Sequence, residues 1–195
     1  GNEWVINGSK IFITNAACEM SMGVTVQAIT GQREDGRPEY TCFLVEHGTR
    51  GFKAVPMHKK MMWRSSNTAE LYFDDVRVPH ANVLGAQGNG FHQMLETLDG
   101  GRLSIGAMGL GGAQGAYEAA LKYAKNREQF GKPISKYQAV GFKLADAAIE
   151  LECARNLLYK ACWLKDKNRS YQKTAAMAKV YCSELMGRVA NNAVQ

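Results

Sequence analysis

The period of the hydrophobic pattern changes near residue 90, and this change limits the possible folds more than any other feature. Before residue 90, short apolar runs are separated by turn residues, and after it apolar side chains recur every three or four positions. Strands followed by helices are typical of an α+β protein. The sequence therefore predicts an antiparallel β-barrel or sandwich domain over residues 1–85 and an antiparallel helical bundle over residues 86–195.

The β portion contains a strong local turn signal. Asn7-Gly8 lies between two apolar runs, at residues 4–6 and 10–14. Asn-Gly favours a type I′ turn, in which both central residues have positive φ, so we expect a β-hairpin here. Further strands are expected at residues 23–30, 40–46 and 69–76.

Three helices are expected, at residues 91–125, at residues 136–165 and from residue 172 onward. The first contains seven glycines, each of which costs about 0.5–1 kcal/mol in a helix interior. Such a load indicates close contact with a neighbouring helix or a ligand, or a break near Gly100. The core stripe of the second helix is expected to comprise Leu144, Ala148, Leu151, Leu158 and Cys162, extended by Phe142, Ala145 and Ile149.

Charge and cysteine content exclude several classes of protein. The net charge of +6 is scattered, which disfavours nucleic-acid binding, and no apolar run is long enough for a membrane span. The five cysteines form no CxxC pair, so we expect reduced, buried thiols and no metal site. The chain opens on Gly1 and closes within a helical pattern. We therefore expect an internal part of a longer protein, for which the absence of a targeting peptide is uninformative.

Residues 126–134 form a corner between the first two helical patterns. Gly131 and Pro133 are ordinary helix-stop residues. Arg127 and Phe130 are expected to share one face of the last helical turn, where a guanidinium beside an aromatic ring suits a planar, phosphorylated ligand. The alternative is structural: Phe130 staples the corner and Arg127 complements the helix C-terminus.

Three blocks together resemble the acyl-CoA dehydrogenase family, in particular its short-chain or butyryl-CoA branch. They are VINGSKIFITN at residues 5–15, LDGGR at residues 98–102, and NREQFGKPI at residues 126–134, which is followed by KYQ and FKLAD. The resemblance extends over the whole chain, including FDDVRVP at residues 73–79. It implies the family's middle β domain and the first part of its C-terminal helical domain.

The resemblance also implies a chemistry and its partners. The family desaturates acyl-CoA thioesters in fatty acid metabolism: a carboxylate removes the α-proton while the β-hydrogen leaves as hydride to N5 of FAD. It implies a homotetramer arranged as a dimer of dimers, with an electron-transfer flavoprotein as acceptor and neither nucleic acid nor membrane as partner. The expected compartment is a bacterial cytoplasm, or the mitochondrial matrix in a eukaryote.

The family's flavin and substrate residues can be matched to positions in this sequence. Phe12, Ile13 and Thr14 match the strand that lies along the isoalloxazine ring, with Phe12 where the family usually has Trp, and with Thr14 near N5. Asp99 and Arg102 match a helix site that meets the acyl-CoA, although such residues can also form an ordinary surface ion pair.

The corner at residues 126–134 and the catalytic base are the remaining parts of the implied site. Arg127, Phe130 and Gln138 match a corner that reaches FAD of the adjacent subunit. Ser135 and Gln138 also fit a capping box, which is an alternative for Gln138. Some branches place the catalytic Glu where this chain has Gly101, so no catalytic residue is expected here and the base should lie in a more C-terminal segment.

Two other functions remain open from the sequence. One is a catalytically inactive member of the family that serves in binding or assembly. The other is a reductase variant that acts on CoA thioesters.

Overall fold

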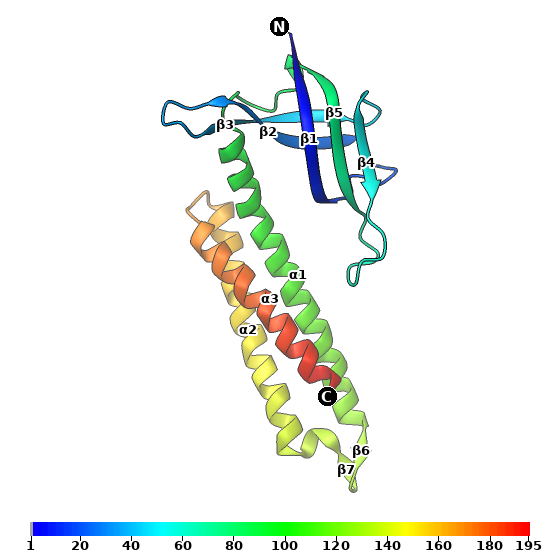
Figure 1. The fold of residues 1–195 in the computed structure, drawn as a ribbon. Coiled ribbons are helices and arrows are strands. Elements are labelled where there is room, and N and C mark those ends of the chain that lie inside the picture. Colours follow the sequence, from blue (N-terminus) through cyan, green and yellow to red (C-terminus); the bar gives the residue numbers. More distant parts are fainter. Residues whose placement is uncertain (1) are drawn as a thin grey trace. The chain divides into compact units, whose positions relative to one another are not determined.

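The computed structural model describes residues 2–195, and it divides into two compact units, Gly1–Leu95 and Glu96–Gln195. The first unit consists mainly of strands and the second of helices (Figure 1). The predicted α+β class is therefore confirmed. The division at residue 95 lies inside a helix, and the domain boundary expected after residue 85 stays a prediction.

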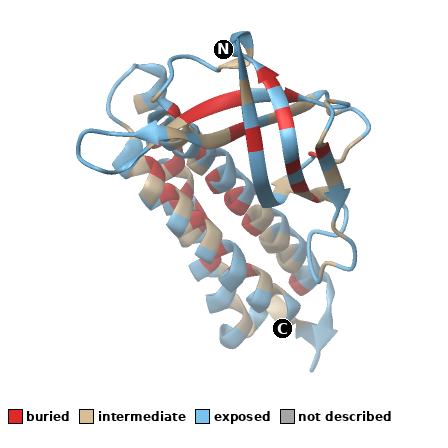
Figure 2. Cartoon of the chain, turned by 45° about the horizontal axis from the view of Figure 1, so that its top comes forward, coloured by how far each residue is buried: buried red, intermediate tan, exposed pale blue. Residues whose placement is uncertain are grey.

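Two antiparallel sheets build the first unit. The larger has the order β1 (Glu3–Thr14), β5 (Thr68–Pro79), β4 (Phe52–Pro56), and the smaller pairs β2 (Gly23–Gln32) with β3 (Pro38–Glu46). Their buried side chains form one core. Figure 2 shows the buried residues, coloured red, along the strands of both sheets. Its largest fully buried members are Phe43, Leu71, Val45, Val76 and Val78. Over residues 2–95 these sheets are separate, so the unit is a sandwich and not a closed barrel.

The predicted Asn7-Gly8 hairpin is wrong, because β1 continues through these residues and pairs with β5 on both sides. A register shift between Ile6 and Gly8 marks a bulge, and Gly8 has a φ of 140°. The Asn7 amide donates to Asp75 Oδ1 at 2.9 Å, and the Asp75 N–H donates to Asn7 Oδ1 at 2.7 Å. The Asn7 side chain therefore joins β1 to β5 instead of stabilising a turn.

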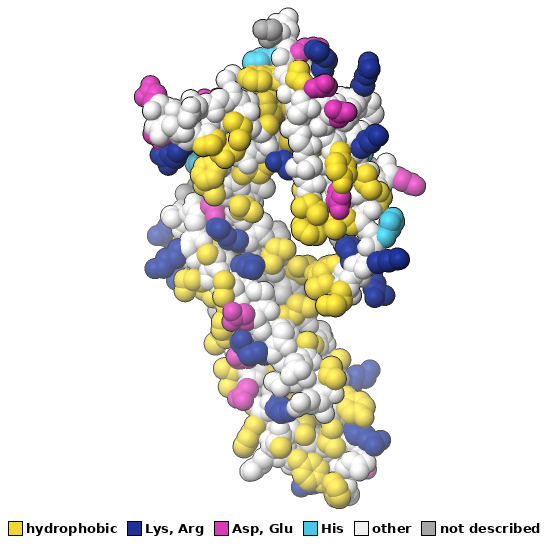
Figure 3. Space-filling model, viewed as in Figure 1, with side chains coloured by type: hydrophobic (Ala, Val, Ile, Leu, Met, Phe, Trp, Pro, Cys, Tyr) yellow, Lys and Arg dark blue, Asp and Glu magenta, His cyan; other side chains and the backbone are white. Residues whose placement is uncertain are grey.

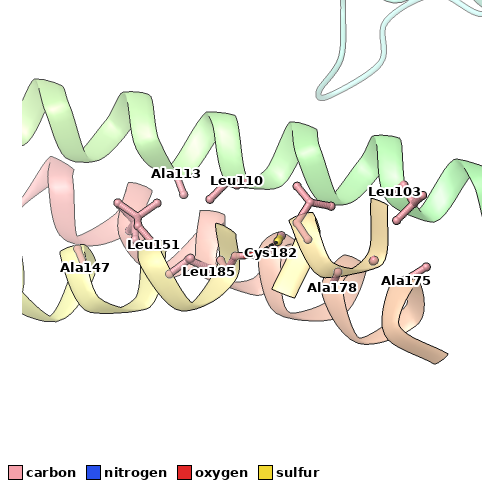
Figure 4. Packing of buried hydrophobic residues seen from close by; sticks show 13 residues of the cluster. Leu103, Leu110, Ala113, Ala147, Leu151, Ala175, Ala178, Cys182 and Leu185 are labelled. Atoms are coloured by element: carbon pink, nitrogen blue, oxygen red, sulfur yellow. Dashed lines mark hydrogen bonds between the residues drawn. The ribbon is translucent and has the colours of Figure 1, made fainter. Parts of the chain in front are cut away.

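The second unit is an antiparallel arrangement of three long helices. They are α1 (Gly90–Asn126), whose first residues belong to the first unit, α2 (Gln138–Asp166) and α3 (Gln172–Val194). A small hairpin, β6 (Glu128–Gln129) and β7 (Lys132–Pro133), and a 3-10 helix (Ile134–Lys136) connect α1 to α2. Figure 4 shows the buried side chains of the three helices pointing toward one another. No helix within residues 2–195 is long and apolar enough to cross a membrane.

The glycines of α1 divide into two groups. A Cβ on Gly109 would lie 2.8 Å from the Cys182 carbonyl oxygen, and one on Gly112 would lie 2.7 Å from Met186. At Gly101, Gly111 and Gly115 a Cβ would meet nothing within 4 Å. The expected close helix contact is thus confirmed for the first group, whereas the alternative of a break near Gly100 is wrong because α1 is continuous.

The register of α2 differs in part from the prediction. Leu151 and Leu158 are buried as expected, but Phe142 and Ile149 are 62% and 63% exposed. The other buried positions of α2 are small: Ala147, Ala154 and Ala161. Alanine lets the three helices approach closely, whereas Phe142 and Ile149 occupy another face of α2. Apolar residues cover more of the α2 surface than the buried stripe does, and the predicted core stripe is therefore centred on the wrong face.

All five cysteines are free thiols. Cys42 and Cys182 are buried, and this burial raises the pKa of both thiols above its ordinary value. Cys153 is exposed on α2, so the prediction of burial fails there.

Candidate functional site

The corner between α1 and α2 is a β-hairpin and not a helical turn. Helix α1 ends at Asn126, and β6 then pairs with β7 through Gln129 and Lys132. The two residues between them, Phe130 and Gly131, have φ values of 52° and 80°. Positive φ at both central residues defines the twist that a two-residue hairpin needs. The expectation that Arg127 and Phe130 share the last helical turn is therefore wrong.

Phe130 is exposed at the tip of this hairpin, with 92% of its surface accessible. Its ring makes an edge contact with Tyr137, with the ring centroids 6.4 Å apart. A ring so exposed does not staple the corner, so the structural alternative for Phe130 is wrong. A left-handed backbone at a bulky residue also costs about 1–2 kcal/mol. The hairpin thus presents an aromatic face outward at an energetic cost.

Arg127 and Gln138 flank this tip. Both side chains are exposed, and within residues 2–195 the Arg127 guanidinium has no ion pair or hydrogen bond. The Ile134 N–H donates to the Arg127 carbonyl at 2.8 Å, which joins the two ends of the hairpin where the 3-10 helix begins. Tyr137 is the N-cap residue of α2, and no side chain caps this helix. The capping-box alternative for Gln138 is therefore wrong.

Asp99 and Arg102 form the ion pair expected from their spacing. The Arg102 guanidinium donates to Asp99 Oδ1, and 18% of the Asp99 side chain is exposed against 40% for Arg102. The neighbouring Gly101 faces open space. The carboxylate fixes one edge of the guanidinium and leaves its other N–H groups available to a ligand.

The flavin residues predicted from the sequence lie at the end of β1. A second register shift, between Lys10 and Ile13, coincides with a φ of 62° at Phe12. The bulge turns Phe12 outward, 67% exposed, whereas Ile13 packs against the sandwich core. Ile13 and Thr14 line a cavity of about 480 Å3 together with residues between 15 and 25. The strand end thus offers an aromatic ring and a threonine beside a concave surface.

A lysine that the sequence did not single out supports this strand end. Lys60 Nζ donates to the Ser66 carbonyl and, at 2.7 Å, to Thr68 Oγ1. Thr68 is the cross-strand partner of Thr14. Lys60 therefore fixes the loop that leads into β5 next to Thr14. Only the long-range strand pairing shows this relation.

The structure does not bring all predicted residues together. Phe12, Ile13 and Thr14 belong to the first unit, and the remaining candidates belong to the second. Within the second unit, Arg127 directly follows α1 and Arg102 precedes it by 25 residues, which places them roughly 37 Å apart at 1.5 Å per residue. The hairpin and the Asp99–Arg102 pair of one chain therefore do not line one compact pocket.

Two family models match the chain. Residues 1–76 match the acyl-CoA dehydrogenase middle domain, and residues 88–195 match the acyl-CoA dehydrogenase C-terminal domain. This chain belongs to the acyl-CoA dehydrogenase family. The resemblance inferred from three sequence blocks is thereby confirmed.

The chain is similar to curated acyl-CoA dehydrogenases, and one of them is described as short-chain specific. A probable acyl-CoA dehydrogenase of Bacillus subtilis is 50% identical over 100% of this chain and 51% of its own length. A short-chain specific acyl-CoA dehydrogenase of Megasphaera elsdenii is 42% identical over 98% of this chain and 49% of its own length. The chain spans about half the length of these relatives.

Solved structures agree in fold. The butyryl-CoA dehydrogenase of Megasphaera elsdenii has a TM-score of 0.92 at 43% identity, covering 99% of this chain and 50% of that chain. A chain in a structure titled as the electron transferring flavoprotein of Acidaminococcus fermentans has a TM-score of 0.92 at 44% identity. It covers 100% of this chain and 50% of that chain. The three helices and two sheets therefore follow the family's architecture.

Proposed function

We propose that this chain is part of an FAD-dependent enzyme that introduces an α,β double bond into a short-chain acyl-CoA thioester. The hairpin between α1 and α2 is the observation that carries the proposal. It holds an exposed, strained Phe130 three residues after Arg127, whose guanidinium has no ion pair or hydrogen bond within residues 2–195. The similarity to short-chain specific and butyryl-CoA dehydrogenases supports the substrate class.

The residues present fit FAD. A guanidinium matches a pyrophosphate through paired hydrogen bonds, and the exposed Phe130 ring offers a flat surface to an aromatic group. The Gln138 amide adds a donor and an acceptor. Phe12 and Thr14 at the end of β1 would hold the isoalloxazine portion, with Ile13 supporting them from the core. When bound, FAD supplies the acceptor for the hydride that leaves the β-carbon.

The substrate side rests on Asp99 and Arg102. Asp99 orients the Arg102 guanidinium, and the open space beside Gly101 leaves room for the pantetheine chain. These residues would bind and orient the thioester, which is the main contribution that a protein makes to such a reaction. Because position 101 is glycine, the proton acceptor at the α-carbon would be a carboxylate from another segment of the full-length protein.

The distance along α1 supports a homo-oligomer. The hairpin lies roughly 37 Å along α1 from the Asp99–Arg102 pair, which is the proposed substrate side of its own chain, and this separation favours a contact with the FAD of another subunit. In the proposed assembly, a homotetramer built as a dimer of dimers, Arg127, Phe130 and Gln138 reach the FAD of a neighbouring subunit. The expected electron acceptor is an electron-transfer flavoprotein, in keeping with the similarity to a chain in the Acidaminococcus fermentans structure.

A spectroscopic experiment tests this function. The full-length protein should be purified, and its flavin absorbance recorded before and after anaerobic addition of butyryl-CoA, with a long-chain acyl-CoA as comparison. We expect a yellow protein whose flavin band bleaches with butyryl-CoA. A colourless protein that also fails to bind added FAD would overturn the proposal. A yellow protein that no acyl-CoA bleaches would instead indicate a catalytically inactive member of the family.

A further inference from the structure

We propose that Tyr137 is a positioning residue, which holds the Phe130–Gly131 tip of the hairpin in the orientation that contacts the cofactor. This inference rests on the proposed function, because it assigns a role to Tyr137 at the same FAD site. It concerns a side chain that precedes α2 and is itself half-buried.

Three contacts connect Tyr137 to the hairpin. Its hydroxyl donates to the Gln129 carbonyl at 2.8 Å, immediately before the tip. Its ring meets the Phe130 ring nearly at right angles, 85° between planes, with centroids 6.4 Å apart. The Lys132 ammonium lies 4.4 Å from the Tyr137 ring centroid, on the other arm of the hairpin. One side chain therefore contacts both arms and the tip.

The hairpin needs such support. Each of its strands, β6 and β7, has only two residues, and an isolated two-stranded hairpin is at best marginally stable in water. Its turn also carries positive φ at Phe130, a bulky residue. Without an external contact, we expect the tip to exchange among several conformations, and an ordered cofactor contact would have to offset that loss of freedom.

Tyr137 is well placed to supply rigidity because its own backbone begins a long helix. Its carbonyl accepts hydrogen bonds from the Val140 and Gly141 N–H groups at 3.0 and 2.8 Å. The side chain therefore connects the hairpin to α2, which spans 29 residues. Apolar packing of the ring would not require the hydroxyl. The hydrogen bond to Gln129 is the feature that fixes the tip rather than merely covering it.

The test is Tyr137→Phe in the full-length protein, which keeps the ring and removes the hydroxyl donor. We expect the FAD dissociation constant to rise about three- to tenfold, the range that corresponds to one neutral hydrogen bond. In the FAD-stripped protein, amide hydrogen exchange at the hairpin tip should accelerate by a similar factor. Tyr159→Phe is the matched control, because Tyr159 is an exposed residue of α2 far from the hairpin.

The outcomes separate this inference from the function on which it rests. If Phe130→Ala weakens FAD binding while Tyr137→Phe leaves both FAD binding and tip exchange at control values, the positioning role is overturned. Weaker FAD binding with unchanged tip exchange also overturns it. If Phe130→Ala and Arg127→Ala both retain FAD normally, the proposed cofactor contact of the hairpin fails instead. Lys132→Met, which removes the cation from the Tyr137 ring, provides a second variant with the same expected direction.

Discussion

Phe130 adopts a backbone conformation that another residue would adopt at lower cost. At a φ of 52° in a two-residue turn, asparagine and glycine are the favoured residues, because a bulky side chain clashes there. With 92% of its surface exposed, the ring gains little from packing within the described chain. A strained, exposed aromatic residue is expected where function requires that side chain.

Replacing Phe130 should therefore have opposite effects on stability and on cofactor binding. Phe130→Asn should raise the free energy of unfolding by about 0.5–1 kcal/mol, because asparagine tolerates the left-handed backbone. The same change should weaken FAD retention, because the ring is lost. Urea denaturation and an FAD titration measure the two effects. A destabilised variant would show that Phe130 supports the fold after all.

The dipeptides Asn7-Gly8 and Phe130-Gly131 show that local sequence rules do not decide where a hairpin forms. Asn7-Gly8 carries the strongest local hairpin signal, yet it forms a bulge inside β1. Phe130-Gly131 carries a weak signal, yet it forms the hairpin. The difference lies in contacts beyond the adjacent residues. Asn7 forms hydrogen bonds with Asp75, and the Tyr137 hydroxyl donates to the Gln129 carbonyl, which precedes Phe130. Such partners are invisible to a reading of neighbouring residues.

The buried thiols give a prediction for alkaline pH. Burial raises the pKa of Cys182 in the folded protein, so the unfolded chain loses this proton at a lower pH than the folded one does. The stabilisation is fully present below the ordinary thiol pKa and is lost as pH rises toward the raised value. The free energy of unfolding should therefore fall above about pH 9. Cys182→Ala should make this decline shallower, whereas Cys153→Ala, at an exposed site, should leave its slope unchanged.

At the scale of elements, α1 offers a matched pair of glycines. A Cβ on Gly109 would lie 2.8 Å from the Cys182 carbonyl oxygen and 3.1 Å from the Ser183 nitrogen, both backbone atoms of α3. Backbone atoms cannot move aside as a flexible side chain can, so α1 and α3 would have to separate. A Cβ on Gly111 would meet nothing within 4 Å.

Alanine at these two sites should therefore change the free energy of unfolding in opposite directions. Gly109→Ala should lower the free energy of unfolding by about 1–3 kcal/mol through overpacking. Gly111→Ala should raise it by about 0.5–1 kcal/mol, because alanine reduces the entropy of the unfolded helix segment. Thermal and chemical denaturation of both variants give the comparison. Equal effects at the two sites would contradict the close approach of α1 to α3.

The sequence predicts which segments form helices and strands better than it predicts which of their residues face the core. The three helices and the strands β2, β3 and β5 follow from apolar periodicity, with bounds that differ from the prediction by a few residues, whereas β1 is one strand in place of the two arms of a predicted hairpin. Strand β4 was missed because Phe52–Pro56 is short. In α2 three alanines and two leucines face the neighbouring helices, whereas Phe142 and Ile149 are exposed. Periodicity weights large side chains, whereas close helix packing selects small ones.

At the scale of the whole molecule, the candidate site is divided over distance. The residues of the hairpin and the Asp99–Arg102 pair were predictable only through the family resemblance, since each group has an ordinary structural explanation when taken alone. Their separation along α1, roughly 37 Å, follows from the predicted helix, and the structure confirms that this helix is continuous. Under the proposed function, this separation has a consequence for assembly: a complete site would require at least two copies of the chain.

Arg127→Ala tests that statement. If Arg127 holds the pyrophosphate of FAD bound to another subunit, its removal should weaken FAD binding about 10- to 100-fold, the range expected for a charge-assisted hydrogen-bonding partner. Because the same cofactor would bridge two subunits, the variant should also dissociate at higher protein concentration than the wild type. The fold itself should be nearly unaffected, since the Arg127 side chain is exposed and has no ion pair within residues 2–195. FAD titration, sedimentation velocity with and without added FAD, and thermal unfolding of the FAD-stripped protein measure the three effects.

Lys125→Ala, which removes a positive charge from the last turn of the same helix, is the control. If both variants behave alike, net charge explains the effect; if Arg127→Ala loses FAD without any change in assembly, the cofactor does not bridge subunits through this hairpin.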